Sequence, residues 1–234
     1  MKSSLKNMVI VLFAITAISS LLVALVNDMT KGAIELSNQQ SKNAAKFKVL
    51  STNESEAKVE SDSTRLIGDF EITVSKIVRN SDNSLIGYAV EAPSITKSGY
   101  ADRIILMVGF MENDGEAMIN GVEVLSQKET PGLGANMTKP GNNLERSIVA
   151  KNPAELTFSV TKEGGSFDAL TGSTISSRAY ANAVESAYAG YLWATGRLDT
   201  SSEAIEAAPT GASMTTELTN NQEPEAQKGE VSNE

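Results

Sequence analysis

The chain has 234 residues and a formal net charge of -9 at pH 7, and it contains neither cysteine nor histidine. The lack of both residue types excludes a Cys/His zinc site, an iron–sulfur cluster, a Ser-His-Asp triad and a cysteine nucleophile, and the acidic balance argues against a nucleic-acid partner, because phosphates are bound by basic patches. No catalytic residue and no metal site are predicted, so any chemistry would come from carboxylates, hydroxyls, amines, backbone dipoles or a borrowed cofactor.

An uncharged, apolar stretch occupies residues 8–26. As a helix it would span roughly 28 Å, close to the hydrocarbon thickness of a bilayer. A cleaved signal peptide is the alternative, but the residues after Val26 offer no small-residue cleavage site. Lys2 and Lys6 precede the stretch, and the positive-inside rule then places the N-terminus in the cytoplasm and the rest of the chain outside. Residues 1–30 are therefore expected to form a cytoplasmic N-terminus and a single transmembrane anchor.

A stalk and a loop are expected after the anchor, over residues 31–65. Residues 31–50 carry apolar side chains at helical spacing, which predicts a helical stalk leaving the membrane. Residues 51–63 are rich in serine, glutamate and lysine and are expected to form a loop. The extracytoplasmic domain is then expected over residues 66–200.

Five segments of this domain are expected to be strands, because their apolar residues alternate or run continuously between turn signals. They are residues 71–78, 85–90, 103–111, 117–125 and 155–161. Segment 103–111 is apolar on both faces, which indicates a strand that is covered on both sides. The sequence Glu-Asn-Asp-Gly that follows it predicts a hairpin turn.

A strong helical pattern appears only near the end of the domain, over residues 176–195. Its aromatic residues Tyr188, Tyr191 and Trp193 are interpreted as helix core rather than as groups that stack on a cofactor. Residues 201–234 are acidic and lack aromatic residues, and they are expected to be disordered. The predicted fold class is α+β: one N-terminal transmembrane helix, then a mixed, mostly antiparallel sheet with packed helices.

Residues 167–178 read Phe-Asp-Ala-Leu-Thr-Gly-Ser-Thr-Ile-Ser-Ser-Arg, where this helix is expected to begin. One interpretation is a hydroxyl-rich helix N-terminus, in which serine or threonine caps the helix and Gly172 makes a turn. The other is a phosphate site, because unpaired N–H groups and the positive dipole end of a helix favour an anion. The residues alone leave both open.

Residues 127–136 read Gln-Lys-Glu-Thr-Pro-Gly-Leu-Gly-Ala-Asn. Pro131-Gly132 is an ordinary turn signal, and a Gly-x-Gly pattern alone is weak evidence for a ligand. Both segments follow expected strands, so they can meet at one end of the sheet.

Together the two segments resemble the FMN-binding domain shared by the G subunit of the Rnf electron-transport complex and the C subunit of the sodium-pumping NADH:quinone reductase. The flavinylation pattern of that family is Asp-x-x-[Ser/Thr]-Gly-[Ala/Ser]-[Ser/Thr]-x-[Ser/Thr]. The residues that fit it in order are Asp168, Thr171, Gly172, Ser173, Thr174 and Ser176. Ser173 takes a place where alanine is commoner, one small residue for another. The sequences Lys-Glu-Thr-Pro-Gly-Leu-Gly (128–134) and Thr-Ile-Ser-Ser-Arg-Ala (174–179) are more similar to the Rnf subunit than to the sodium-pump subunit. The resemblance covers about residues 8–197.

The resemblance implies that FMN is bound covalently, through a phosphoester to Thr174, and that a separate flavin transferase attaches it. Asp168 is implied to be read by that transferase, with a turn-capping role as the alternative. The residues of the same segment implied to bind the cofactor near its phosphate and ribityl oxygens are Thr171, Gly172, Ser173, Ser176 and Ser177. Those implied to lie along the isoalloxazine ring are Thr130, Gly132, Leu133 and Gly134, and Glu129 of the same stretch is also implied to belong to the cofactor site. Glu129 is implied either to tune the flavin or only to hydrogen-bond its own loop.

The function implied by the resemblance is that of an electron carrier rather than a complete catalyst. The chain would be a single-pass subunit of a bacterial inner membrane, with its main domain periplasmic, in an ion-translocating complex that moves electrons between ferredoxin and NAD. Its partners would be the other subunits of the complex and, during maturation, the transferase. Two alternatives stay open: the C subunit of the sodium pump, and an anchored extracytoplasmic module without a cofactor.

Overall fold

The computed structural model describes residues 5–100, 102–113 and 115–198 of the chain. The tail expected to be disordered, 201–234, lies outside the described residues. Within them, one helix is long and apolar enough to cross a membrane.

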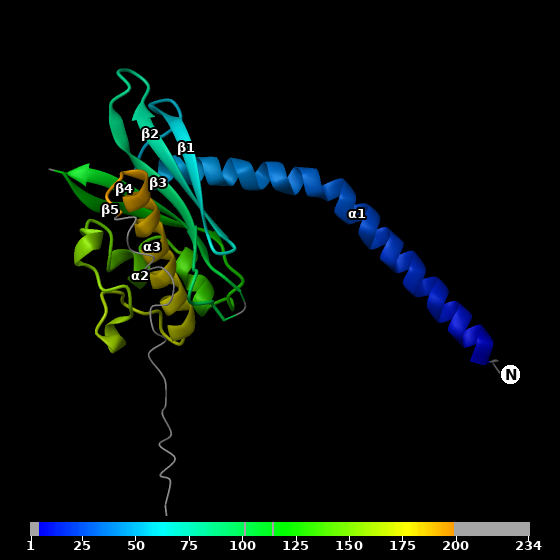
Figure 1. Ribbon diagram of the computed structural model, residues 1–234. Coiled ribbons are helices and arrows are strands. Elements are labelled where there is room, and N and C mark those ends of the chain that lie inside the picture. The colour runs from blue at the N-terminus through cyan, green and yellow to red at the C-terminus, as the bar shows by residue number, and fades with distance from the viewer. Residues whose placement is uncertain (1–4, 101, 114, 199–234) are drawn as a thin grey trace, which may run out of the picture. The chain divides into compact units, whose positions relative to one another are not determined.

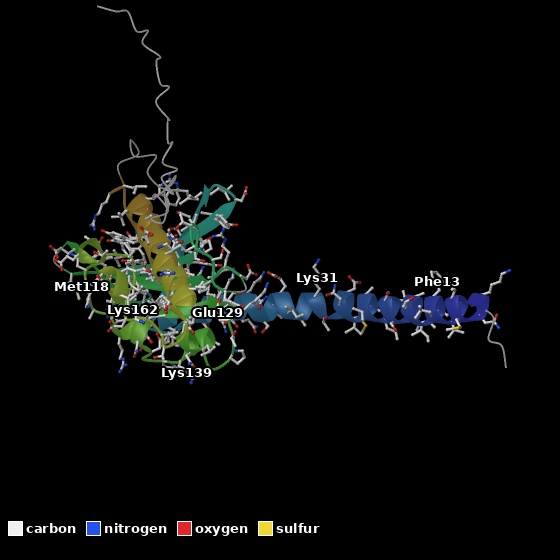
Figure 2. The ribbon with its side chains drawn as sticks, turned by 90° about the horizontal axis from the view of Figure 1, so that it is seen from below. Phe13, Lys31, Met118, Glu129, Lys139 and Lys162 are labelled. Atoms are coloured by element: carbon white, nitrogen blue, oxygen red, sulfur yellow. The ribbon has the colours of Figure 1, made fainter. Side chains whose placement is uncertain are left out.

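This helix is α1 (Leu5–Lys48), and it runs without interruption through both the expected anchor and the expected stalk. In its first part the apolar side chains are exposed on every side, as a lipid-facing helix requires, and Phe13 is 73% exposed. Figure 2 labels Phe13 in this apolar part and Lys31 in the polar part that follows. Residues 31–48, predicted to be helical, are thus part of the same helix as the apolar stretch before them.

A five-stranded antiparallel sheet follows, and its strands are in the order of the chain. The strands are β1 (Ala57–Ile67), β2 (Phe70–Arg79), β3 (Leu85–Pro93), β4 (Ile105–Asn113) and β5 (Glu116–Ser126). Four of the five expected strands are confirmed as β2 to β5, and so is the hairpin turn between β4 and β5.

Two expectations about the sheet were wrong. The loop expected at 51–63 becomes strand β1 from Ala57 onward, so the sheet begins before residue 66. β1 is an edge strand whose side chains are mostly exposed, and such a strand can be polar throughout. The strand expected at 155–161 is instead irregular, bracketed by the 3-10 turns η2 (Pro153–Glu155) and η3 (Thr161–Glu163). Only one isolated β-bridge, between Val160 and Phe167, is formed by this segment among the described residues. Alternating burial along a segment therefore does not by itself mean that the segment pairs with a neighbouring strand.

The C-terminal helix α3 (Thr174–Ala194) packs across one face of the sheet, as Figure 1 shows. Its Val184 and Tyr191 are fully buried against β4, where Val108 and Phe110 face this side. The aromatic rings of Phe110 and Tyr191 stack with their centroids 5.0 Å apart. This face is the main hydrophobic core.

The other face of the sheet receives the end of α1 and the turn after it. Phe47, Val49 and Leu50 pack there with Met107 of β4. Strand β4 is therefore covered on both sides, as the sequence predicted. A Cβ on Gly109 would lie 3.0 Å from the Cβ of Val49, so glycine permits this close approach.

Three lysines at the end of α1 form ion pairs with acids on three different strands. Lys42 pairs with Glu91 of β3, Lys46 with Asp62 of β1 and Lys48 with Glu123 of β5. Lys46 is buried, and its ammonium donates to Asp62 at 3.0 Å. Burial alone would raise the pKa of the Asp62 carboxyl, but hydrogen bonds from Ser75 and Lys46 bring it below its usual value.

Candidate functional site

Two loops and the beginning of a helix meet at one end of the sheet. β3 and β5 are both antiparallel to β4, so they run in the same direction and end at the same side, at Pro93 and Ser126. Loop 94–104 follows β3, and loop 127–136 follows β5. Hydrogen bonds join both loops to the first turns of α3. Figure 2 views the domain from below and shows Glu129 beside this end of α3.

Loop 127–136 contains a β-turn at its Pro-Gly. The N–H of Leu133 donates to the carbonyl of Thr130 at 3.1 Å. Gly132 has a φ of 79°, which is the left-handed conformation that the third position of a type II turn requires. The turn displays the side chain of Leu133, which is 45% exposed.

A second β-turn precedes α3. The N–H of Ser173 donates to the carbonyl of Leu170 at 3.1 Å, and Gly172 has a φ of 74°. A Cβ on Gly172 would lie 3.4 Å from Cδ2 of Leu133, which is van der Waals contact. The two sequence segments are therefore in contact, and the prediction that they meet at one end of the sheet is confirmed.

Helix α3 begins at Thr174 with Ser173 as its N-cap residue. The Ser173 side chain makes no capping hydrogen bond, and the first turn contains no acidic residue. The first N–H groups of a helix have no intrahelical partner and carry the positive end of its dipole. The expected serine cap is thus absent. The half-buried Thr174 lies among donors that suit an anion, so the residues present fit a phosphate esterified to its hydroxyl.

Glu129 is a buried carboxylate that joins three segments. Its Oε1 accepts a hydrogen bond from the N–H of Tyr100 at 2.7 Å, and its Oε2 accepts one from the hydroxyl of Ser176 at 2.5 Å. Its side chain is enclosed, since the whole residue is 7% exposed. A Cβ on Gly134 would approach Oε2 of Glu129 to 2.7 Å and the Ser176 oxygen to 2.6 Å, so glycine is needed for this contact.

The three serines of the helix start differ in what their hydroxyls contact. Ser177 is fully buried; its hydroxyl donates to the carbonyl of Ser173 at 2.8 Å and accepts from the N–H of Leu170 at 3.0 Å. The Ser176 hydroxyl is committed to Glu129. Ser173 is buried at the N-cap position. Ser176 and Ser177 therefore use their hydroxyls to fix the turn and the loop.

The other residues predicted for the site lie at its surface. Thr130, Thr171, Gly132, Gly172 and Asp168 are all exposed. Together with the half-buried Thr174 they form the accessible part of the site. Asp168 precedes the Leu170–Ser173 turn and is exposed.

Arg178 lies one helical turn after Thr174 and pairs with Glu163. Its Nε donates to Oε1 of Glu163 at 2.7 Å, and this hydrogen bond from Arg178 keeps the pKa of the Glu163 carboxyl below its usual value. Residues at this spacing share one face of a helix, so Arg178 lies on the same side of α3 as Thr174, with its charge balanced by Glu163.

The aromatic residues of α3 belong to the core, as predicted. Tyr191 is fully buried, and Tyr188 and Trp193 pack partly buried against the same core. Desolvation raises the pKa of Tyr191, and a hydrogen bond to Glu112 adds to this. Thr174 lies 17 residues, or roughly 26 Å of helix, before Tyr191. These rings are therefore remote from the helix start.

Loop 94–104 is the part of the site that the sequence did not reveal. Asn182 of α3 is buried and accepts hydrogen bonds from the N–H groups of Thr96 and Lys97 at 2.9 and 3.2 Å. Tyr100, bound through its N–H to Glu129, is 77% exposed. The only signal in the sequence was a tyrosine shortly before a buried strand, and that is too common to mark a site.

Comparison with known proteins identifies a matching domain family. Residues 99–189 match the FMN-binding domain. This range contains Tyr100, Glu129 and the whole of the helix start around Thr174.

Several curated relatives are similar to the chain. It is 30% identical over 182 residues to the G subunit of the Na(+)-translocating ferredoxin:NAD(+) oxidoreductase complex of Acetobacterium woodii, covering 75% of this chain and 86% of the relative. It is 29% identical to the G subunit of an ion-translocating oxidoreductase complex of Methanosarcina acetivorans, covering 77% of this chain and 91% of that protein. The corresponding G subunit of Aliivibrio fischeri is 39% identical over 104 residues, which is 43% of this chain and about half (47%) of the relative.

Proposed function

Because this chain belongs to the family of G subunits of ion-translocating oxidoreductase (Rnf) complexes, we propose that it carries FMN covalently on Thr174 and relays electrons within such a complex. The observation that carries the attachment point is the start of α3, which has no side-chain cap and no acidic residue in its first turn. Bound FMN supplies chemistry that none of the side chains offers, the exchange of one or two electrons with neighbouring centres.

The chain's own contribution is to bind and orient the cofactor. The Oγ1 of Thr174 loses its proton and forms the bond to the phosphorus of FMN. The flavin nucleotide that donates the FMN loses the group that was previously bound to that phosphorus. The N–H groups of the first turn of α3 face the resulting phosphodiester charge. Arg178 lies one turn further along the same face of the helix, where it is paired with Glu163.

The remaining site residues have two kinds of role. Glu129, Ser176 and Ser177 hold the loop and helix start together through hydrogen bonds among themselves and to the backbone. The second group lies along the cofactor. On the side of the isoalloxazine ring it consists of the exposed Thr130, Gly132 and Leu133, with the buried Gly134 following them in the loop. Thr171, Gly172 and Ser173 lie on the phosphate side. We assign Asp168, which is exposed just before the turn, to recognition by the flavin transferase.

Partners and placement follow from the same family. The relative from Acetobacterium woodii is named for a complex that translocates sodium and connects ferredoxin with NAD. We propose that this chain joins other subunits of a comparable complex in a bacterial inner membrane. Helix α1 would cross the membrane once, with the two lysines that precede its apolar part on the cytoplasmic side and the sheet domain on the other.

Neither alternative is favoured. The curated relatives described above are G subunits, which speaks against a C subunit of the sodium-pumping NADH:quinone reductase. The match to the FMN-binding domain speaks against a module without a cofactor.

The test is the intact mass of the full chain, co-expressed with a flavin transferase and purified in detergent, followed by peptide mapping. We expect a gain of one FMN less water, located on the peptide that contains Thr174. A colourless protein of unmodified mass, with the transferase shown to be active on a control substrate, would contradict the proposal.

A further inference from the structure

Several exposed apolar residues belong to the segments that form the candidate site. Outside α1, the large apolar residues that are exposed within the described part of the domain are Leu66, Leu85, Tyr100, Leu133 and Ile175. Three of these five, Tyr100, Leu133 and Ile175, belong to the segments that meet at the start of α3, and we refer to them as the apolar rim. Apolar groups left together in water at one place are typical of a binding surface.

Tyr100 is the most exposed member of the apolar rim, at 77%. Its ring gains almost nothing from burial in the protein itself, so the fold does not explain its position. The four other tyrosines of the chain are Tyr88, Tyr180, Tyr188 and Tyr191, and all four are buried or partly buried in the main core. Tyr100 therefore differs from them in facing outward at the site.

The backbone that presents Tyr100 is firmly held. The N–H of Gly99 donates to the carbonyl of Asp102 at 2.8 Å, and the Asp102 carboxylate pairs with Lys128 at 2.6 Å. Arg103 donates to the Ser94 carbonyl at 2.7 Å and so closes the base of the loop. An exposed aromatic ring on a loop with this many internal hydrogen bonds loses little conformational entropy when a flat ligand covers it.

One carboxylate group connects Tyr100 to the helix that carries Thr174. Oε1 of Glu129 holds the N–H of Tyr100, and Oε2 holds the hydroxyl of Ser176, which is two residues beyond Thr174. Leu133 lies against the turn that precedes Thr174, since a Cβ on Gly172 would lie 3.4 Å from its Cδ2. Ile175, the next residue after Thr174, is half exposed on the helix itself.

We propose that Tyr100 stacks on the isoalloxazine ring of the flavin, with Leu133 and Ile175 completing the apolar surface under that ring. The inference rests on the proposed covalent attachment at Thr174, because a phosphate fixed there leaves the ring to settle on apolar surface within reach of the ribityl chain. Flat aromatic systems stack on one another in offset geometry. Tyr100 acts as a positioning residue: it fixes the ring orientation and leaves the opposite face of the flavin open to a redox partner.

The experiment compares three variants of the full, flavinylated chain in detergent: Tyr100→Ala, Tyr100→Phe and Leu85→Ala. Leu85 is an exposed apolar residue at the start of β3, whereas Tyr100 follows the end of that strand, so Leu85→Ala is a matched control at the opposite end of the sheet. Flavin fluorescence yield and the access of iodide to the flavin are measured for each, with circular dichroism to verify the fold.

A phenol stacked on flavin quenches its emission by electron donation, whereas a phenyl ring covers the flavin but does not donate. We therefore expect Tyr100→Ala to raise emission at least about threefold and to increase quenching by iodide. Tyr100→Phe should raise emission but keep the iodide protection of the wild type. Leu85→Ala should match the wild type in both measurements.

The outcomes separate the inference from the proposed function. Wild-type protein without covalent flavin would contradict the function, and the inference with it. Flavinylated wild type, with unchanged emission in the Tyr100→Phe variant, would contradict the inference alone. That comparison stands even if Tyr100→Ala is flavinylated poorly.

Discussion

The hydroxyl of Ser176 donates a 2.5 Å hydrogen bond to the buried carboxylate of Glu129, across 47 residues of sequence. This contact joins the loop after β5 to the first turn of α3. Because the other carboxylate oxygen holds the N–H of Tyr100, one buried side chain determines how three segments of the site are arranged.

Glu129→Gln should loosen this arrangement. The amide replaces one acceptor oxygen with an NH2 donor, so the Ser176 hydroxyl has to accept instead of donate, and two hydrogen bonds to a charged carboxylate become weaker neutral ones. We expect a loss of about 1–3 kcal/mol in the free energy of unfolding, measured by urea denaturation, together with reduced flavin incorporation. Glu60→Gln is the control: Glu60 forms an exposed ion pair with Lys76, and such a pair contributes about 1 kcal/mol or less. Equal stability of the two variants would show that the buried contact is unimportant.

Thr174→Val should leave the fold intact and abolish covalent flavin. Valine has nearly the shape of threonine but lacks the oxygen that forms the phosphoester, and Thr174 is only half buried. The measurement is in-gel flavin fluorescence after co-expression with the transferase. Thr64→Val, at an exposed hydroxyl on strand β1, should remain fluorescent. Undiminished fluorescence of the Thr174 variant would disprove this attachment point.

Ser177→Ala should destabilise the domain although residue 177 does not face the site surface. Removing its hydroxyl leaves the N–H of Leu170 and the carbonyl of Ser173 without this partner in a buried place. The expected cost is about 1–3 kcal/mol, seen as a lower midpoint in urea. Thr171→Ala, at an exposed hydroxyl, should change stability by less than about 0.5 kcal/mol. A Ser177 variant as stable as the wild type, but without flavin, would instead indicate a direct contact with the cofactor.

Asp62→Asn should destabilise the domain at neutral pH and lose this effect in acid. The pKa of Asp62 is lowered in the folded protein, so the charged carboxylate stabilises the fold above its ordinary value of 3.8. That contribution disappears as the pH falls through the lower, folded-state pKa. The free energies of unfolding of wild type and variant should therefore differ at pH 7 and converge below pH 3.8. Asp69→Asn, at an exposed position in the β1–β2 turn, is the control and should change the free energy of unfolding by less than about 0.5 kcal/mol at pH 7. A difference that stays constant down to the lowest pH would contradict the role of the charge.

Much of the fold was predictable because its elements carry strong local patterns. The 19 or so apolar residues of α1 and the two-sided apolar strand β4 leave few structural alternatives. β1 was missed because an edge strand with an exposed face needs no apolar alternation, and its identity depends on pairing with β2. The segment 155–161 shows the opposite case: its apolar and polar residues alternate because some of its side chains are buried, but in the part of the chain that the structure describes it has no neighbouring strand to pair with.

The sequence by itself determined the membrane-crossing helix, the positions of β2 to β5 along the chain and the two motifs of the site, because helix length, strand alternation and turn residues act over short distances along the chain. Only the tertiary structure decided which hydroxyls remain accessible. Ser176 and Ser177 look equivalent to Thr171 and Thr174 in the sequence, yet both are buried and bonded within the protein. The same is true of Tyr100, whose N–H is connected to Ser176 of α3 only through the carboxylate of Glu129. Burial and hydrogen bonding of a polar group are properties of the packed chain, and a local pattern does not specify them.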